Sequence, residues 1–294
     1  MIKKTFTIPS GYQLLQEGRR EMVIRAGREA DLRRQGLLSP ACLWGKTHGP
    51  GTLRGRGEVL IMPAGQDIVA IRKYRHGGLF RRLTGDLFLC GNRPLQEVVV
   101  TEQARSVGVP TLEILAAIRE RGWGGWYRGY LITTFLPTAH DMITSLDRCQ
   151  DHRKRQTVIK RAAAAVKTMH GSGIYHADLH LKNFLVEEGK KEVTVYLIDF
   201  DKSTITPHLS PARRMKNLAR LDRSAEKLKR QGLSVTRKDK EIFCHAYATG
   251  DPEIQDAMKT FVERYQWYTV LYRGGWWIAR VFYPRYNPWK KSTT

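Results

Sequence analysis

The 294-residue sequence contains no run of about 18 apolar residues, so it predicts no helix that spans a membrane. The basic start Met1–Lys4 is followed by threonines, a proline and a glycine rather than an apolar segment, so no export signal is predicted. The four cysteines, Cys42, Cys90, Cys149 and Cys244, form no C-x-x-C pair, which indicates reduced thiols in a cytosolic compartment. Any contact with a membrane is then expected to be peripheral.

Acidic residues are few compared with basic ones. The 28 Asp and Glu residues stand against 50 Lys and Arg residues, which gives a formal net charge of +22. This excess predicts a polyanionic partner: nucleic acid, an anionic membrane face, or a phosphorylated or acidic substrate. A basic surface without such a partner is the alternative. Length and a hydrophobic content of 41% suit a folded protein of one large domain or two lobes.

The most informative stretch runs from His176 to Asp199. It begins with His-x-Asp-Leu-x-x-x-Asn, the pattern of the kinase catalytic loop, and an Asp-Phe pair follows after a predicted strand, turn and strand. In this pattern Asp178 is expected to accept a hydrogen bond from the acceptor hydroxyl. Asn183 and Asp199 are expected to bind Mg²⁺ on the phosphates of ATP. The stretch therefore predicts a phosphoryl-transfer site.

Plainer interpretations of the same residues stay open from the sequence. Asp178 can cap a turn, and Asn183 can satisfy a buried loop. His176 fits a residue packed behind the loop better than a catalyst. His176 and His180 also have the spacing of zinc ligands on a helix, but the glycines just before them indicate that the helix has already ended.

Upstream, the sequence predicts a hairpin of two strands, at 58–62 and 68–74. A glycine-rich segment precedes it. Gly55 and Gly57 in that segment are predicted to let backbone N–H groups approach phosphates, because no Cβ intervenes. Glycine-rich turns between strands are also common without any ligand.

The second of these strands carries the expected phosphate contact. Its run Val-Ala-Ile-Arg ends at Arg72, where kinases carry Val-Ala-Ile-Lys. Arg72 is therefore predicted to contact the phosphates, with Lys73, on the opposite face of the strand, as the alternative. A helix is predicted over 94–106, and its Glu97 is expected to position Arg72. Glu102 on the same helix is the competing carboxylate.

The order of elements predicts an N-terminal nucleotide-binding lobe, residues 1–136, and a C-terminal catalytic and acceptor-binding lobe, residues 137–294. Thr134, Phe135 and Leu136 at the junction are expected to form the hinge whose backbone groups meet the adenine of ATP.

Three helices are expected in the second half. Apolar residues recur at helical intervals over Val158–Met169 and stop at Gly171. Segment 213–230 predicts a helix with a strongly basic face, and Asp251, followed by a proline, predicts the N-cap of another. Segment 113–118 in the first half is compatible with strand or helix.

Three runs carry a family resemblance: His-Ala-Asp-Leu-His-Leu-Lys-Asn, Leu-Ile-Asp-Phe-Asp-Lys-Ser, and the basic run that begins at Arg213. They resemble the lipopolysaccharide core kinases, most of all the 3-deoxy-D-manno-octulosonic acid (Kdo) kinases. The run that begins at Arg72 is similar to that family's third strand, where arginine often replaces lysine. The resemblance implies an α+β, bilobal protein-kinase-like fold. It also implies transfer from ATP to the 4-hydroxyl of Kdo on Kdo–lipid A, at the cytoplasmic face of the inner membrane of a Gram-negative bacterium.

Two departures from protein kinases refine this hypothesis. Asp201 replaces the glycine of Asp-Phe-Gly, and no Ala-Pro-Glu segment follows. Both features favour a small-molecule or lipid acceptor over a protein. A heptose or other small-molecule kinase and an atypical protein kinase of the same fold are the enzyme alternatives. A nucleic-acid-binding module would explain the charge but shows no recognised motif, so no nucleic acid partner is expected.

Overall fold

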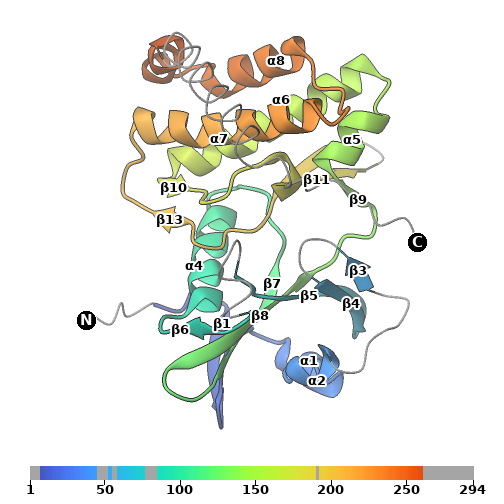
Figure 1. Cartoon of the computed structure of the whole chain (residues 1–294), viewed down its shortest axis with the longest axis vertical. Helices are drawn as coiled ribbons and strands as arrows, with labels where there is room; N and C mark the ends of the chain where they lie inside the picture. Colours follow the sequence, from blue (N-terminus) through green and yellow to red (C-terminus); the bar gives the residue numbers. More distant parts are fainter. Residues whose placement is uncertain (1–6, 45–51, 55–57, 77–84, 190–191, 261–294) are drawn as a thin grey trace, which may run out of the picture. The chain divides into compact units, whose positions relative to one another are not determined.

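Strands dominate the first half of the chain and helices the second, as Figure 1 shows. The computed structural model describes residues 7–44, 52–54, 58–76, 85–189 and 192–260. The elements of the first half are β1 (Tyr12–Glu17), β2 (Arg20–Arg25), α1 (Glu29–Arg34), α2 (Ala41–Trp44), β3 (Thr52–Arg54), β4 (Glu58–Ala64), β5 (Asp67–Lys73), β6 (Phe88–Leu89), α4 (Arg93–Ser106), β7 (Ile114–Arg121) and β8 (Trp126–Thr134). Those of the second half are β9 (Ala139–Asp141), α5 (Met142–Arg148), α6 (His152–Gly171), β10 (Ile174–Tyr175), the 3₁₀ helix η1 (Leu181–Asn183), β11 (Phe184–Glu188), β12 (Val193–Leu197), β13 (Thr204–Ile205), α7 (Pro211–Lys229) and α8 (Arg237–Ala248).

The strands of the first half form one antiparallel sheet in the order β1-β2-β7-β8-β5-β4-β3, and β6 pairs with β8. The predicted hairpin is confirmed as β4 and β5, with Met62 opposite Val69. Segment 113–118 proves to be strand, because β7 begins at Ile114. Its first five residues are buried on both faces of the sheet, which gives a continuous apolar run and conceals the period of two.

Both faces of the sheet are covered by apolar side chains, since neighbouring residues of a strand point to opposite faces. On β2, Met22 belongs to the core cluster on the side of α1, whereas Val23 belongs to the cluster that contains Leu95 of α4. On β5, Ile71 lies in the first cluster. Arg72 therefore faces α4.

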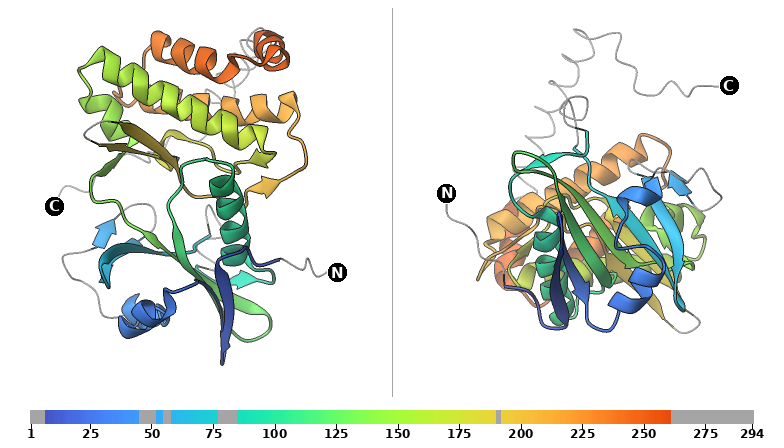
Figure 2. Two further views of the ribbon diagram at one scale, coloured as in Figure 1. Left: turned by 180° about the vertical axis from the view of Figure 1, so that it is seen from behind. Right: turned by 90° about the horizontal axis from the view of Figure 1, so that it is seen from below.

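Helix α4 packs against β7 and β8 and lies alongside the sheet (Figures 1 and 2). It confirms the helix predicted over 94–106, with the Oδ1 of Asn92 accepting from the N–H of Leu95 at 3.2 Å. The approach to β8 is close. A Cβ on Gly129 would lie 2.8 Å from the Cγ of Pro94, so glycine at this position lets α4 settle on the sheet.

Helix α6 delivers the chain to the predicted catalytic loop and confirms the helix and stop expected from the sequence. Gly173 follows it with a φ of 76°, in the left-handed region. A Cβ there would lie 1.8 Å from the backbone oxygen of Thr206, whose N–H donates to the oxygen of Gly173 at 3.0 Å. Only glycine fits this turn, which lets β10 pair with β13 directly before His176.

A buried polar chain ties three helices to the loop. The hydroxyl of Tyr247 on α8 lies 2.7 Å from the Nδ1 of His170 on α6, and the Nε2 of His170 lies 3.0 Å from the Oδ1 of Asn217 on α7. Asn217 then donates from its Nδ2 to the backbone oxygen of His176 at 2.8 Å. Because an amide oxygen only accepts, the Nε2 of His170 carries a proton and donates it to Asn217.

Burial lowers the pKa of His170 from 6.5 to about 4. The unfolded chain takes up a proton below pH 6.5, while the folded chain does not until about pH 4. We therefore expect this group to cost the fold at most about 3 kcal/mol of unfolding free energy as the pH falls through that window. Urea unfolding at pH 7.5 and below should show a shallower pH dependence for His170→Gln than for the wild type. The exposed-residue variant His152→Gln should match the wild type, and equal slopes in all three proteins would contradict this account.

The chain divides into two compact units, Met1–Tyr247 and Ala248–Thr294. In the second unit residues 252–260 are helical, and the Oδ1 of Asp251 accepts from the N–H of Ile254 at 3.1 Å, which confirms the predicted N-cap. Among the described residues of both units, every helix is too short or too polar to cross a bilayer.

Candidate active site

The predicted catalytic loop is held by its histidine. His176 is fully buried, its Nε2 donates to the backbone oxygen of Ile198 at 3.1 Å, and its Nδ1 accepts from the N–H of Asp178 at 3.2 Å. The ring also packs against Phe200, with 5.0 Å between centroids. Both ring nitrogens are therefore used inside the protein, which leaves none for a zinc ion. No cluster of three metal-binding His, Cys, Asp or Glu side chains occurs in the described part of the chain.

Asn183 and Asp199 lie on neighbouring backbone segments, since the N–H of Ile198 donates to the oxygen of Asn183 at 3.0 Å. Asn183 is buried and its Nδ2 donates to the oxygen of Asp178 at 2.9 Å, so its Oδ1 is the free acceptor of the amide. Asp199 has a φ of 65°, a left-handed conformation that aspartate tolerates better than most residues. An amide oxygen and a carboxylate are the hard oxygen donors that Mg²⁺ prefers, so these two residues fit that ion.

Arg72 joins the sheet, α4 and the loop. Its Nη2 donates to both carboxylate oxygens of Glu97 at 2.6 Å, and its Nη1 donates to the Oδ1 of Asp199 at 2.5 Å. Tyr74, which directly follows β5, also donates its hydroxyl to Glu97. The Glu97 side chain is only 3% exposed, and this burial raises its pKa while Arg72 opposes the rise. Burial would also raise the pKa of Asp199, but Arg72 outweighs it and holds that pKa below its ordinary value.

The alternatives named for these two positions lie elsewhere. Lys73 forms an ion pair with Asp86 and lies over the Tyr130 ring on the other face of β5. Glu102 accepts from the hydroxyl of Tyr12 at 2.8 Å and pairs with Arg25 of β2 and Arg105 of α4. Of the two glutamates and two cations left open by the sequence, Glu97 and Arg72 are the pair in contact.

One anchor of the site was not predicted. Arg93, at the start of α4, binds Asp201 through two parallel contacts, with its Nε 3.0 Å from the Oδ1 and its Nη2 on the Oδ2. Its guanidinium also lies over the ring of Phe88 at 4.4 Å. The aspartate that replaces the usual glycine thus fastens the loop after Asp199 to the helix that carries Glu97. No local sequence signal pointed to this pair, because its members are 108 residues apart.

Two backbone N–H groups of the predicted hinge already donate to other backbone oxygens of the protein. The N–H of Thr134 donates to the oxygen of Glu113 at 2.9 Å, and the N–H of Phe135 donates to the oxygen of Ile68 at 2.9 Å. Within the described residues the N–H of Leu136 has no protein acceptor, so it is the hinge donor left for a ligand. The predicted phosphate-contacting glycines, Gly55 and Gly57, lie outside the described residues.

Asp178 is half-exposed and both of its oxygens face a neighbour. Arg220 of α7 donates from its Nη2 to the Oδ1 at 2.6 Å, and the Nε2 of His180 lies 3.5 Å from the Oδ2. His180 and Arg220 together lower the pKa of this carboxyl to about 2. A carboxyl group this acidic stays ionised at neutral pH and can orient a hydroxyl by accepting its hydrogen bond, but it is a weak general base.

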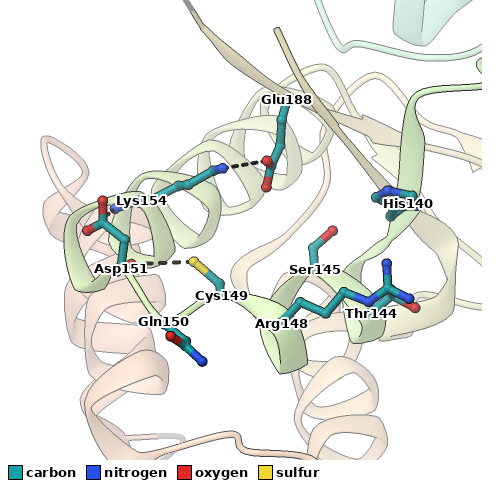
Figure 3. A pocket seen from close by; sticks show the side chains of 9 residues that line it. All are labelled: His140, Thr144, Ser145, Arg148, Cys149, Gln150, Asp151, Lys154 and Glu188. Carbon is teal, nitrogen blue, oxygen red and sulfur yellow. Dashed lines mark hydrogen bonds and ion pairs between the residues drawn. The ribbon is translucent and has the colours of Figure 1, made fainter. Parts of the chain in front are cut away.

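A cavity of about 330 Å³ lies where β9, α5 and the start of α6 meet the end of β11 (Figure 3). Lys154 and Glu188 form an ion pair at its edge, and the thiol of Cys149 points to the backbone oxygen of Asp151. It contains none of the predicted site residues. Its lining consists of His140, Thr144, Ser145, Arg148, Cys149, Gln150, Asp151, Lys154 and Glu188.

The fold resembles a solved structure of WaaP in complex with acyl carrier protein. The TM-score is 0.55 at 18% sequence identity, and the match covers 83% of this chain and 98% of the other. A strand-rich first half followed by a mostly helical second half, together with this match, makes the chain an α+β protein of the bilobal protein-kinase-like class.

The sequence matches the profile of the lipopolysaccharide kinase (Kdo/WaaP) family over residues 50–247, and the chain belongs to that family. A 3-deoxy-D-manno-octulosonic acid kinase of Vibrio vulnificus strain CMCP6 is 30% identical over 204 residues, which cover 68% of this chain and 81% of the relative. The enzyme of the same description from Xylella fastidiosa strain M23 is 30% identical over 219 residues, covering 72% and 83%. The chain is therefore a kinase, a phosphotransferase for which ATP is the implied donor.

Proposed function

We propose that this protein transfers the γ-phosphoryl group of ATP to the 4-hydroxyl of the Kdo sugar on Kdo–lipid A. The observation that carries the proposal is the meeting of Asp178, Asn183, Asp199 and Arg72 around one loop in a chain of the lipopolysaccharide kinase family. The relatives named as Kdo kinases, at about 30% identity over most of their length, support the choice of acceptor.

In this proposal each residue has a role that follows from its contacts. Asp178 orients the acceptor hydroxyl, which suffices because the transition state of phosphoryl transfer is loose and needs alignment more than proton removal. Arg72 contacts the phosphates and Glu97 fixes its position. The backbone at Thr134, Phe135 and Leu136 receives the adenine, with the Leu136 N–H as donor.

Asn183 and Asp199 would hold Mg²⁺ through oxygen atoms. When bound, the ion would neutralise charge on the phosphates of ATP. Residues 1–136 would then serve as the nucleotide-binding lobe, and residues 137–294 as the catalytic and acceptor-binding lobe.

A cationic row along α7 supports an anionic glycolipid as the acceptor. Its members are all exposed and recur every three or four residues, so they share one face of the helix. They are Arg213, Lys216, Arg220, Arg223 and Lys227. We place the enzyme as a peripheral protein at the cytoplasmic face of the inner membrane of a Gram-negative bacterium, where such a row would meet anionic head groups.

The double variant Lys216→Glu/Lys227→Glu should bind vesicles that contain Kdo–lipid A at least about 10-fold more weakly than the wild type, because each lysine near an anionic surface contributes about 1 kcal/mol. Co-sedimentation at low and high salt measures this. Arg237→Glu/Lys238→Glu makes the same charge change on exposed residues of α8 and serves as the matched control. Equal losses in both double variants would contradict a role for the α7 row.

The acceptor is tested directly by incubating the enzyme with ATP and Mg²⁺ together with one of three acceptors: Kdo–lipid A, a heptosylated core glycolipid or a generic basic protein. Mass spectrometry then shows which product gains a phosphate. We expect the Kdo–lipid A product alone. Transfer only to the heptosylated acceptor would assign a heptose kinase instead, and transfer to the basic protein an atypical protein kinase. Salt-dependent oligonucleotide binding without any transfer would favour a nucleic-acid-binding module.

A further inference from the structure

Arg220 holds its carboxylate far more loosely than the two buried arginines that anchor an aspartate, Arg93 and Arg155. Arg93 and Arg155 each grip an aspartate through two contacts and are largely buried. Arg220 makes a single contact, to Asp178, and its side chain is 44% exposed while that of Asp178 is 50% exposed. An exposed pair of this kind contributes about 1 kcal/mol or less to stability. The fold therefore does not depend on it, and the pair can open.

The backbone that carries Arg220 is nevertheless fixed against the loop. Three residues before it, Asn217 donates to the oxygen of His176 at 2.8 Å. Four residues after it, the hydroxyl of Ser224 accepts from the N–H of Leu181 at 3.2 Å. Only the side chain of Arg220 has to move for its guanidinium to change partner.

Acceptor binding creates a conflict at Asp178. The hydroxyl that receives the phosphoryl group has to reach the carboxylate, yet Arg220 lies on the Oδ1 and His180 faces the Oδ2. If Arg220 gives up the Oδ1, its exposed guanidinium becomes available to an anionic group on the acceptor. A carboxylate on the acceptor sugar, close to the accepting hydroxyl, matches the planar fork of a guanidinium.

We propose that Arg220 is an acceptor-binding residue that selects sugars bearing a carboxylate, pairing with Asp178 in the empty site and with the sugar carboxylate once the acceptor is bound. This inference rests on the proposed function and deepens it. Kdo is such a sugar acid, whereas a neutral heptose offers no carboxylate to replace Asp178.

The test measures phosphoryl transfer to two acceptors by the wild type and by variants of Arg220. One acceptor is Kdo–lipid A, and the other is the same glycolipid with the Kdo carboxylate converted to its methyl ester. For the wild type we expect kcat/KM to be about 10- to 100-fold higher for the acid, mostly through KM, the range of a charge-assisted hydrogen bond. In Arg220→Gln the ratio should fall close to one. Arg220→Lys, which keeps the charge without the fork, should give an intermediate ratio, and the exposed α8 variant Arg237→Gln should keep the wild-type ratio and rate.

A purely structural role would lower the rates for both acceptors and leave their ratio unchanged. An unchanged ratio in Arg220→Gln therefore overturns the proposal, as does a wild-type ratio close to one. Transfer by the wild type to neither glycolipid would instead overturn the proposed function, and this inference with it.

Discussion

Asp178→Ala is expected to lower kcat by about 10²- to 10⁴-fold, the usual contribution of a residue that engages the reacting hydroxyl. Affinity for ATP should persist, because the residues expected to meet the nucleotide, Arg72 and the hinge, do not contact the Asp178 side chain. Loss of one carboxylate also removes repulsion between the site and its anionic substrates. The fold should lose about 1 kcal/mol or less, since the pair with Arg220 is exposed.

Two measurements separate this outcome from general damage. Calorimetric titration with ATP should give a dissociation constant close to that of the wild type, and thermal unfolding should show a similar midpoint. Asp178→Asn, which keeps the shape but not the charge, should be nearly as inactive. Asp256→Asn, at an exposed site in the helix over 252–260, is the matched control. Turnover by Asp178→Ala close to the wild-type rate would remove Asp178 from the mechanism.

The parts of the site that could be predicted from the sequence are those whose residues follow one another at fixed spacing. His176, Asp178 and Asn183 lie in one loop, and the strand–turn–strand between Asn183 and Asp199 brings its two ends together by pairing. The contact between Arg72 and Glu97 needed only the alternation of β5 and the position of α4 after it. Residue spacing and strand alternation were therefore enough to predict these contacts from the sequence.

The remaining contacts depend on tertiary packing that no local rule determines. Asp201 looked in the sequence like a glycine lost from a motif, yet in the fold it binds Arg93 from the other half of the chain. Arg220 was one cation among many in a basic helix. It faces Asp178 because Asn217 and Ser224 fix the rotation of α7 against the loop. The hinge donors were reduced to one because pairing with Glu113 and Ile68 uses the other two.

Arg72 connects stability and catalysis, and a pair of variants can separate them. Arg72→Met should destabilise the fold by about 3 kcal/mol, because it leaves the carboxylate of Glu97, 3% exposed, without its cation. It should also lower kcat/KM by about 10²- to 10³-fold through loss of the charge at the phosphates. Arg128→Met removes an exposed arginine from β8 of the same sheet and should change the unfolding free energy by less than about 1 kcal/mol.

Adding Glu97→Gln to Arg72→Met should recover most of the lost stability, since the amide stays neutral in the buried site and still accepts from Tyr74. It should not recover transfer, because the cation that meets the phosphates is still missing. Urea unfolding and the Kdo–lipid A assay measure the two quantities on the same preparations. Recovery of both together would show that Arg72 acts only by balancing Glu97, whereas recovery of stability alone places its charge in the phosphoryl-transfer step.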